Sequence, residues 1–126
     1  DSEMYSYSYD KKEDKLTAVS NYNLPSKVQG VAFDDNGSIY LSTSYGRNNS
    51  SYLKVYSSLL SLDKKPNEPK VKVEMPPCSE EVAIADGTGF VLFESASAKY
   101  FEGTDGMGKS PAPIDKLLEV SVASIW

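Results

Sequence analysis

Acidic side chains stand at two places in the second half of the chain where they could do chemistry. Glu80 and Glu81 begin an apolar run, and Glu94 continues the apolar residues of the next run. Hard cations such as Ca²⁺ bind about six to eight oxygen ligands of this kind. A carboxylate on an apolar face is also a candidate general acid, because burial raises its pKa. We predict Glu80 and Glu81 as ligand-binding residues and Glu94 as the candidate catalytic residue; the alternative for Glu94 is a structural ion pair with Lys99 or Arg47.

A second group of candidates comes from the first half of the chain. Tyr45 and Arg47 flank a glycine directly after the run SIYLSTS, and Arg47 is the only arginine of the sequence. A guanidinium group can bind a carboxylate through two parallel hydrogen bonds. Gln29 is the second residue of the run VQGVAF and stands where Glu80 stands in the later run. We therefore predict Arg47, Tyr45 and Gln29 as ligand-binding residues, with a loop-bracing role as the alternative for Arg47.

Several classes of site are excluded by residue types that the sequence lacks. There is no histidine, which excludes serine–histidine triads and histidine-ligated zinc. Cys78 is the single cysteine, and the glutamates that follow it favour a raised thiol pKa, so we expect a structural residue. No complete ligand set can be assigned. The sequence thus predicts no metal site and no cofactor, with a divalent cation such as Ca²⁺ as the alternative.

Charge and hydropathy limit the partners. The 18 acidic residues outnumber the 13 basic ones, the net charge is −5, and no cluster of basic residues exceeds a pair. This pattern excludes a nucleic-acid-binding surface. No apolar run approaches the ~20 residues that a membrane-spanning helix needs. The start at Asp1 without a signal peptide suggests a segment of a longer protein, and an extracellular or cell-envelope location is favoured.

An internal repeat indicates which elements would position the candidate residues. Pro25–Ser44 aligns without gaps with Pro76–Ser95, at an offset of 51 residues. The identical pairs are Pro25/Pro76, Val31/Val82, Ala32/Ala83, Asp35/Asp86, Leu41/Leu92 and Ser44/Ser95. At this offset Gln29 and Glu80 both stand at the start of the first segment of a unit. The sequence therefore predicts that they occupy equivalent places.

The repeating unit has the pattern of β-strands. The runs VQGVAF, SIYLSTS, YLKVYSSL and KVKVEM are rich in β-branched and aromatic residues. Asp34–Gly37 and Asp86–Gly89 are turn sequences that favour hairpins. Residues 1–25 would supply two strands and residues 79–126 three, the last of them in Ile114–Val120.

Four short strands in about 40–50 residues is the size of a propeller blade. The first strand of each unit carries small residues, Gly30, Ala32 and Ala83, as a strand close to a crowded axis requires. The second strand is apolar on both faces, as expected when sheets cover both sides. We predict an all-β fold of propeller-like antiparallel four-stranded blades: about two and a half blades, an incomplete ring. Residues 1–126 form a single β-blade domain, the C-terminal part of a longer propeller. Its partners are the remaining blades or further copies of the chain.

The segments QGVAFDDNGSIYLSTSYGR and FVLFESASAKY also carry a family resemblance. The chain resembles the C-terminal region of poorly characterised bacterial proteins with propeller-like repeats, and is loosely similar to NHL, strictosidine-synthase-like and gluconolactonase-type propellers. The resemblance covers about residues 25–101 and implies blade architecture. In the lactonase-type relatives, acidic and asparagine side chains hold a divalent cation in the central channel, and no complete set of these matches here.

Two further segments carry alternatives. Tyr5, Tyr7 and Tyr9 alternate along one strand face; we expect them to pack on a neighbouring blade, and the alternative is an exposed row that stacks on a sugar or a peptide. Ala98–Asp115 is dense in glycine and proline, which predicts a long loop. Gly103–Ser110 within it formally matches a phosphate-binding loop, but prolines follow where the helix of that motif would begin.

These features favour a propeller-type binding or scaffolding module for an unknown ligand, without catalysis. One alternative is a cation-assisted hydrolase of the lactonase type that uses Glu80, Glu81 or Glu94 near an axial channel. Another is a cell-surface interaction protein that uses the tyrosine row.

Overall fold

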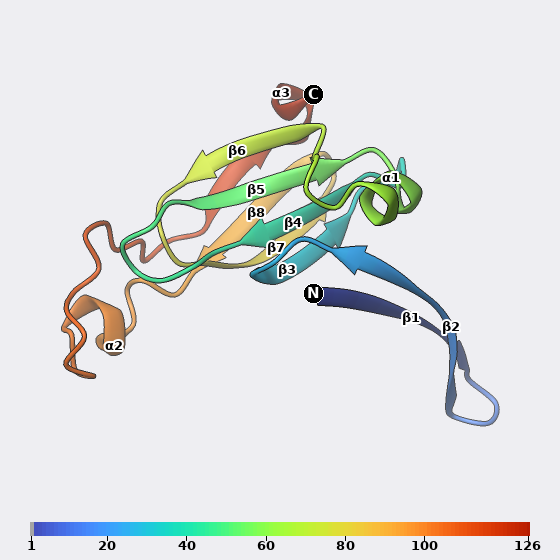
Figure 1. Cartoon of the computed structure of the whole chain (residues 1–126), viewed down its shortest axis with the longest axis horizontal. Coiled ribbons are helices and arrows are strands. Elements are labelled where there is room, and N and C mark those ends of the chain that lie inside the picture. Colours follow the sequence, from blue (N-terminus) through green and yellow to red (C-terminus); the bar gives the residue numbers. More distant parts are fainter. Residues whose placement is uncertain (1) are drawn as a thin grey trace.

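The computed structural model describes residues 2–126, which form three antiparallel sheets joined by short helices and loops (Figure 1). This confirms the predicted all-β class. The strands are β1 (Ser2–Asp10), β2 (Lys15–Leu24), β3 (Val28–Phe33), β4 (Ile39–Thr43), β5 (Ser51–Tyr56), β6 (Val71–Met75), β7 (Ser79–Ala85), β8 (Thr88–Phe93) and β9 (Leu118–Ser121). The helices are α1 (Leu59–Lys64), α2 (Ala98–Phe101) and α3 (Val122–Ile125). No helix among the described residues is long and apolar enough to cross a membrane.

β1 and β2 form a two-stranded ribbon that projects from the body of the molecule (Figure 1). Only its base is held, because Met4 and Leu24 pack against the body. Tyr5, Tyr7 and Tyr9 lie beyond this contact and are 56%, 55% and 55% exposed. The expectation that they pack on a neighbouring sheet is therefore wrong for the described residues.

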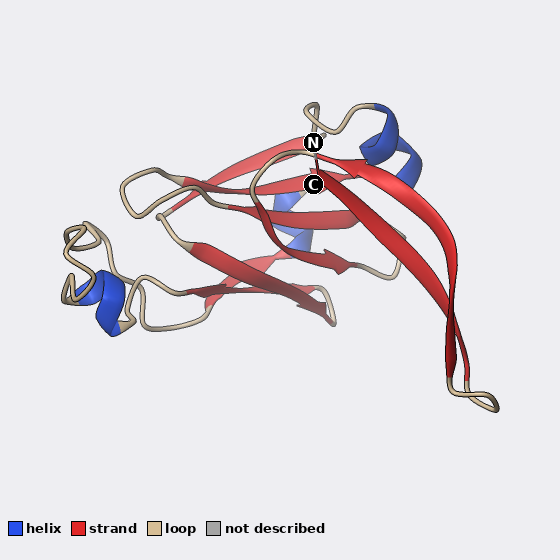
Figure 2. Ribbon diagram, turned by 60° about the horizontal axis from the view of Figure 1, so that its bottom comes forward, coloured by secondary structure: helices blue, strands red, loops and turns tan. Residues whose placement is uncertain are grey.

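The body consists of two sheets packed face to face, β3-β4-β5-β6 and β7-β8-β9 (Figure 2). Apolar side chains from both sheets fill the interface: Ala32, Tyr40, Leu53, Val55, Met75, Val82, Val91 and Phe93. Two buried serines also meet there, since the hydroxyls of Ser42 on β4 and Ser79 on β7 hydrogen bond at 2.7 Å. Each hydroxyl satisfies the other, so neither is left unpaired in the core.

β4 is buried along its whole length, as its sequence predicts. Tyr40 faces the second sheet, whereas Ile39 and Leu41 face the opposite side, where α1 and the base of the ribbon cover them. The capping box that begins α1 uses Ser58, whose side chain accepts a hydrogen bond from the backbone of Ser61. The strand run YLKVYSSL in the sequence ends at Leu59, and no helix was predicted after it, although a serine cap is the usual sign of one.

The hairpin turns form at the turn sequences that were predicted between the strands. Gly37 adopts a left-handed φ of 80° and closes the β3–β4 turn by donating to the Asp34 carbonyl at 3.1 Å. Asp86 and Gly87 have φ of 49° and 76° between β7 and β8, as a two-residue hairpin loop requires. The last predicted strand is confirmed in part, because β9 begins only at Leu118.

Gly30 sets the distance between the two sheets. A Cβ atom at this position would lie 2.7 Å from the Glu80 carbonyl oxygen and 2.8 Å from the Glu81 Cα. Real Cβ contacts are not this short, and both atoms belong to the backbone of β7, which cannot move aside as a side chain does. The absence of a side chain at Gly30 therefore allows β3 to approach β7.

We predict that Gly30→Ala destabilises the protein by about 1–3 kcal/mol, the usual cost of overpacking a close contact. Urea unfolding measures the change. The matched control is Ala83→Val, which adds carbon at an exposed position of β7 and should alter stability by less than about 0.5 kcal/mol. Equal stability of Gly30→Ala and the parent protein would contradict the close approach.

Candidate functional site

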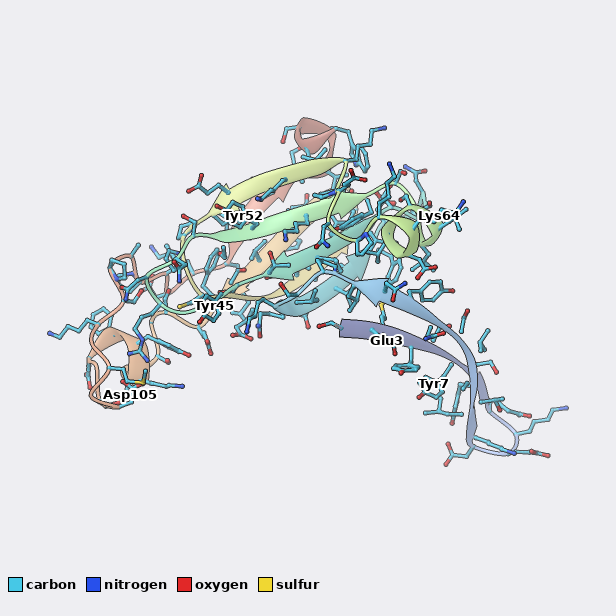
Figure 3. All side chains as sticks on the ribbon, in the orientation of Figure 1. Glu3, Tyr7, Tyr45, Tyr52, Lys64 and Asp105 are labelled. Carbon is cyan, nitrogen blue, oxygen red and sulfur yellow. The ribbon has the colours of Figure 1, made fainter. Side chains whose placement is uncertain are left out.

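The loop that leaves β4 lies at the end of the molecule that also carries α2, away from the tip of the ribbon (Figures 1 and 3). Tyr45 in this loop is 64% exposed and lines three adjoining hollows. The sequence prediction named Tyr45 as a ligand-binding residue. The structure places it where all three hollows meet.

The first of these, here called the acidic hollow, has a volume of about 250 Å³ and lies between the starts of β3 and β7. Gln29 of β3 and Glu80 of β7 line it together with Glu94, which directly follows β8, and Tyr100 of α2. The close approach at Gly30 brings the two strand starts together. Three of the residues predicted from sequence, Gln29, Glu80 and Glu94, thus share one hollow with Tyr45.

Glu80 and Glu94 interact directly inside the acidic hollow. Burial, followed by the hydrogen bond and the negative charge of Glu94, raises the pKa of Glu80 to about 7. A hydrogen bond to Glu94 also raises the pKa of Tyr100. Glu80 therefore keeps its proton close to neutral pH, and its carboxyl group can then both donate and accept hydrogen bonds.

Cys78 lies beside this pair and is buried, as expected for a structural residue. Burial first, and the nearby Glu94 carboxylate second, raise the pKa of its thiol. The protonated thiol is a poor nucleophile.

Glu81 does not take part in the acidic hollow. Its carboxylate accepts a hydrogen bond from the backbone of Val82 at 2.9 Å and lies against Gly30. The pairing of β7 with β8 shifts register between Ser79 and Val82, so simple alternation from Glu80 does not describe this end of the strand. The ligand-binding prediction for Glu81 has no support from its position.

Arg47 is 8% exposed, and its guanidinium group contacts the loop that follows α2. Nη1 and Nη2 donate to the two carboxylate oxygens of Asp105 at 3.1 and 2.6 Å, and Nη1 also donates to the Gly108 carbonyl oxygen at 2.6 Å. The guanidinium carbon lies 4.6 Å from the centre of the Tyr100 ring. The hydrogen bonds from Arg47 hold the pKa of Asp105 at about 2. This is the bracing role that stood as the alternative for Arg47.

The long loop predicted in Ala98–Asp115 is present, with α2 at its start. Gly103, Gly106 and Gly108 all have a left-handed φ, and no helix begins directly after them, as a phosphate-binding loop would require. Arg47 and the Tyr100 carbonyl, which accepts from the Ser110 backbone at 2.6 Å, hold this loop against the body.

The second hollow at Tyr45, here called the basic hollow, has a volume of about 440 Å³. Lys27, Lys54 and Tyr52 line it with Tyr45, and the remaining lining residues are serine, threonine and asparagine. The sequence prediction missed both lysines. The alternation in SYLKVY does place Lys54 and Tyr52 on one face of β5, but which face stays open depends on packing.

Among residues 2–126, no group of three histidine, cysteine, aspartate or glutamate side chains is placed to hold a metal ion. The alternative of a divalent cation stays a prediction.

Comparisons of the chain with protein-family models, with curated proteins and with solved structures found no match. Function is therefore inferred from the residues around Tyr45.

The raised pKa of Glu80 predicts a pH-dependent loss of stability. Folding favours protonated Glu80, so this contribution is complete below its ordinary pKa of 4.5 and is lost as the pH rises through about 7. Glu80→Gln removes the titrating group. We therefore expect the difference in melting temperature between Glu80→Gln and the parent protein to change by about 2–4 °C in favour of the variant as the pH is raised from 4.5 to 8.

Glu119→Gln on the exposed face of β9 is the matched control and should show no such change. Melting curves of Glu80→Gln and the parent protein that stay parallel across this pH range would contradict the interaction with Glu94.

The contacts of Arg47 predict that it keeps the long loop closed. In Arg47→Ala we expect amide hydrogen exchange within residues 98–115 to become at least about tenfold faster. The loop can then open without first breaking the hydrogen bonds between Arg47 and Asp105. Mass spectrometry locates the change. Lys65→Ala, which breaks the exposed ion pair of Lys65 with Glu68, is the control. Unchanged exchange in the loop would show that other contacts hold it.

Proposed function

We propose that the chain is a ligand-binding module built from propeller-type blades, with its binding site at the Tyr45 end of the stacked sheets. The observation that carries this proposal is the exposed Tyr45 side chain where three hollows meet. A large exposed aromatic ring among polar hollows is typical of a recognition surface.

The blade architecture is supported by backbone features that recur at the spacing of the sequence repeat. Lys27 and Cys78, which precede β3 and β7, both have a left-handed φ, of 64° and 72°. Their carbonyl oxygens accept backbone hydrogen bonds from Ser44 at 3.1 Å and from Glu94, one residue before the repeat partner of Ser44, at 3.0 Å. Both strands also shift register shortly after they begin. Such details are hard to attribute to chance in two unrelated hairpins.

Apolar side chains are exposed at both ends of the sheet stack. They support the proposal that further blades or further copies of the chain are the partners. Val31 and Phe33 on β3 are 38% and 47% exposed, and Leu92 on β8 is 50% exposed. Val31 and Phe33 lie on the face turned away from the second sheet, and Leu92 lies on the outer face of that sheet. A further sheet on either side would bury them.

The thiol of Cys78 is not activated as a nucleophile, which favours a binding function over catalysis. Glu80 and Glu94 offer acid–base chemistry, but Cys78 beside them is buried with a raised thiol pKa. Without an activated nucleophile, the pair serves hydrogen bonding to a ligand better than covalent chemistry.

A second candidate function, surface interaction through the ribbon, is favoured by its exposed tyrosines. Tyr7 is as exposed as its neighbours in the row and projects from the opposite end of the molecule (Figure 3). An exposed row of this kind suits contact with a partner surface.

We expect Tyr45→Ser to abolish binding on a combined array of glycans and peptides, while Tyr7→Ser leaves binding intact. Both tyrosines are more than half exposed, so neither change should alter the melting temperature by more than a few degrees. The comparison separates the two candidate sites.

Binding that depends on Tyr7 and ignores Tyr45 would replace the proposed site with the ribbon. An array on which the parent protein binds nothing would refute the binding function itself.

A further inference from the structure

The basic hollow lies on the face of the four-stranded sheet that points away from the second sheet. Thr43 of β4 and Tyr52 of β5 are cross-strand neighbours on this face, with Lys54 two residues further along β5. Lys27 and Tyr45 line the hollow from the loops that flank β3 and β4. A volume of about 440 Å³ exceeds what a simple ion needs, and it falls in the range of small-molecule sites.

Within the described part of the chain, the lysines of this hollow are not held in ion pairs, although Lys27 also lines the acidic hollow together with Glu80 and Glu94. Lys27 and Lys54 form no ion pair with any carboxylate among residues 2–126, and no acidic side chain lines the hollow. Lys54 also stands directly opposite Lys72 on β6. Like charges in this arrangement repel, and burial together with the Lys72 charge lowers the pKa of Lys54.

One acidic residue on this face is Glu74, the cross-strand neighbour of Tyr52. Its carboxylate accepts a hydrogen bond from the Ser50 hydroxyl at 2.8 Å and makes no ion pair with the two lysines. A bound anion would supply the missing negative charge, in a chain whose net charge is −5. Two lysines of one hollow that form no ion pair with the described residues therefore point to an anionic ligand.

The other lining groups limit what that anion is attached to. Every lining side chain carries a hydroxyl, an amide or an ammonium group, and none is aliphatic. Peptide side chains and apolar ligands are held mainly by aliphatic and aromatic walls. A sugar ring instead uses hydroxyl and amide partners, and its C–H face fits the electron-rich face of a tyrosine ring.

We propose that the basic hollow binds an acidic saccharide, a sugar ring that carries a carboxylate. This inference rests on the proposed binding function and names the ligand class for part of its site. Lys27 and Lys54 hold the carboxylate through charge-assisted hydrogen bonds. Tyr45, whose ring centre lies 4.7 Å from the Lys27 ammonium nitrogen, lies beside that carboxylate and covers the sugar ring. Asn49 donates to the Tyr45 carbonyl oxygen at 2.9 Å, which leaves its own amide oxygen for a sugar hydroxyl.

Calorimetry and amide chemical-shift titration with galacturonate as the probe test this assignment. We expect a dissociation constant in the range of about 1 mM, typical of a single-ring ligand with a few polar contacts. Galactose, which lacks the carboxylate, and acetate, which lacks the ring, should each bind at least about tenfold more weakly.

Lys54→Met should weaken galacturonate binding by at least about tenfold. The variant removes a charge that faces Lys72, so its melting temperature should equal or exceed that of the parent protein. Lost binding would then not reflect lost folding. Lys64→Met on α1, a lysine remote from the hollow (Figure 3), is the matched control and should bind normally.

Two results would overturn the ligand class and leave the binding function standing. In the first, galactose binds as tightly as galacturonate. In the second, acetate or a glutamate-containing peptide binds as tightly as galacturonate, and tight binding of the peptide would assign the hollow to acidic peptides. A lack of response to galacturonate up to about 20 mM also overturns the ligand class. The binding function itself fails only if the parent protein binds nothing on the array.

Discussion

The contact of β3 with β7 at Gly30 is the constraint on which the rest of the molecule depends. Because no side chain separates the two backbones, the sheets pack closely enough to bury their facing apolar residues and the Ser42–Ser79 hydroxyl pair. The same approach brings Gln29 and Glu80 to one hollow. Packing of the core and formation of the acidic hollow are therefore consequences of one interaction.

The sequence predicted the fold wherever local signals decide the structure. Strand boundaries at Val28–Phe33 and the turns at Gly37 and Gly87 follow from β-branched runs and from residues that tolerate a left-handed φ. The ribbon was predicted as strands but with the wrong environment, since nothing in the alternation of Tyr5, Tyr7 and Tyr9 states whether a sheet covers them. Burial of a strand face depends on what packs there, which a local pattern does not contain.

The candidate site was predicted in part for the same reason. The sequence placed Gln29 and Glu80 at matching positions of a predicted repeat, and both residues line the acidic hollow in the structure. Arg47 was singled out correctly as unusual, but its partner Asp105 lies 58 residues further along the chain. No local pattern links the two. The same holds for Lys54, whose contact with the basic hollow depends on which face of β5 the rest of the chain leaves uncovered.

The face of the four-stranded sheet that carries the basic hollow changes character across its strands. Val31 on β3 is apolar and exposed, and its cross-strand row continues through Leu41, which α1 and the base of the ribbon cover, to Lys54 and Lys72. A further sheet that covered the β3 side would bury apolar side chains and be stabilised. At the β5–β6 side the same sheet would have to remove water from two lysine ammonium groups, which is unfavourable. Assembly through the apolar part is therefore compatible with an open basic hollow, because the charges themselves oppose burial by a neighbouring sheet. Binding and stacking can use one face without competing for the same residues.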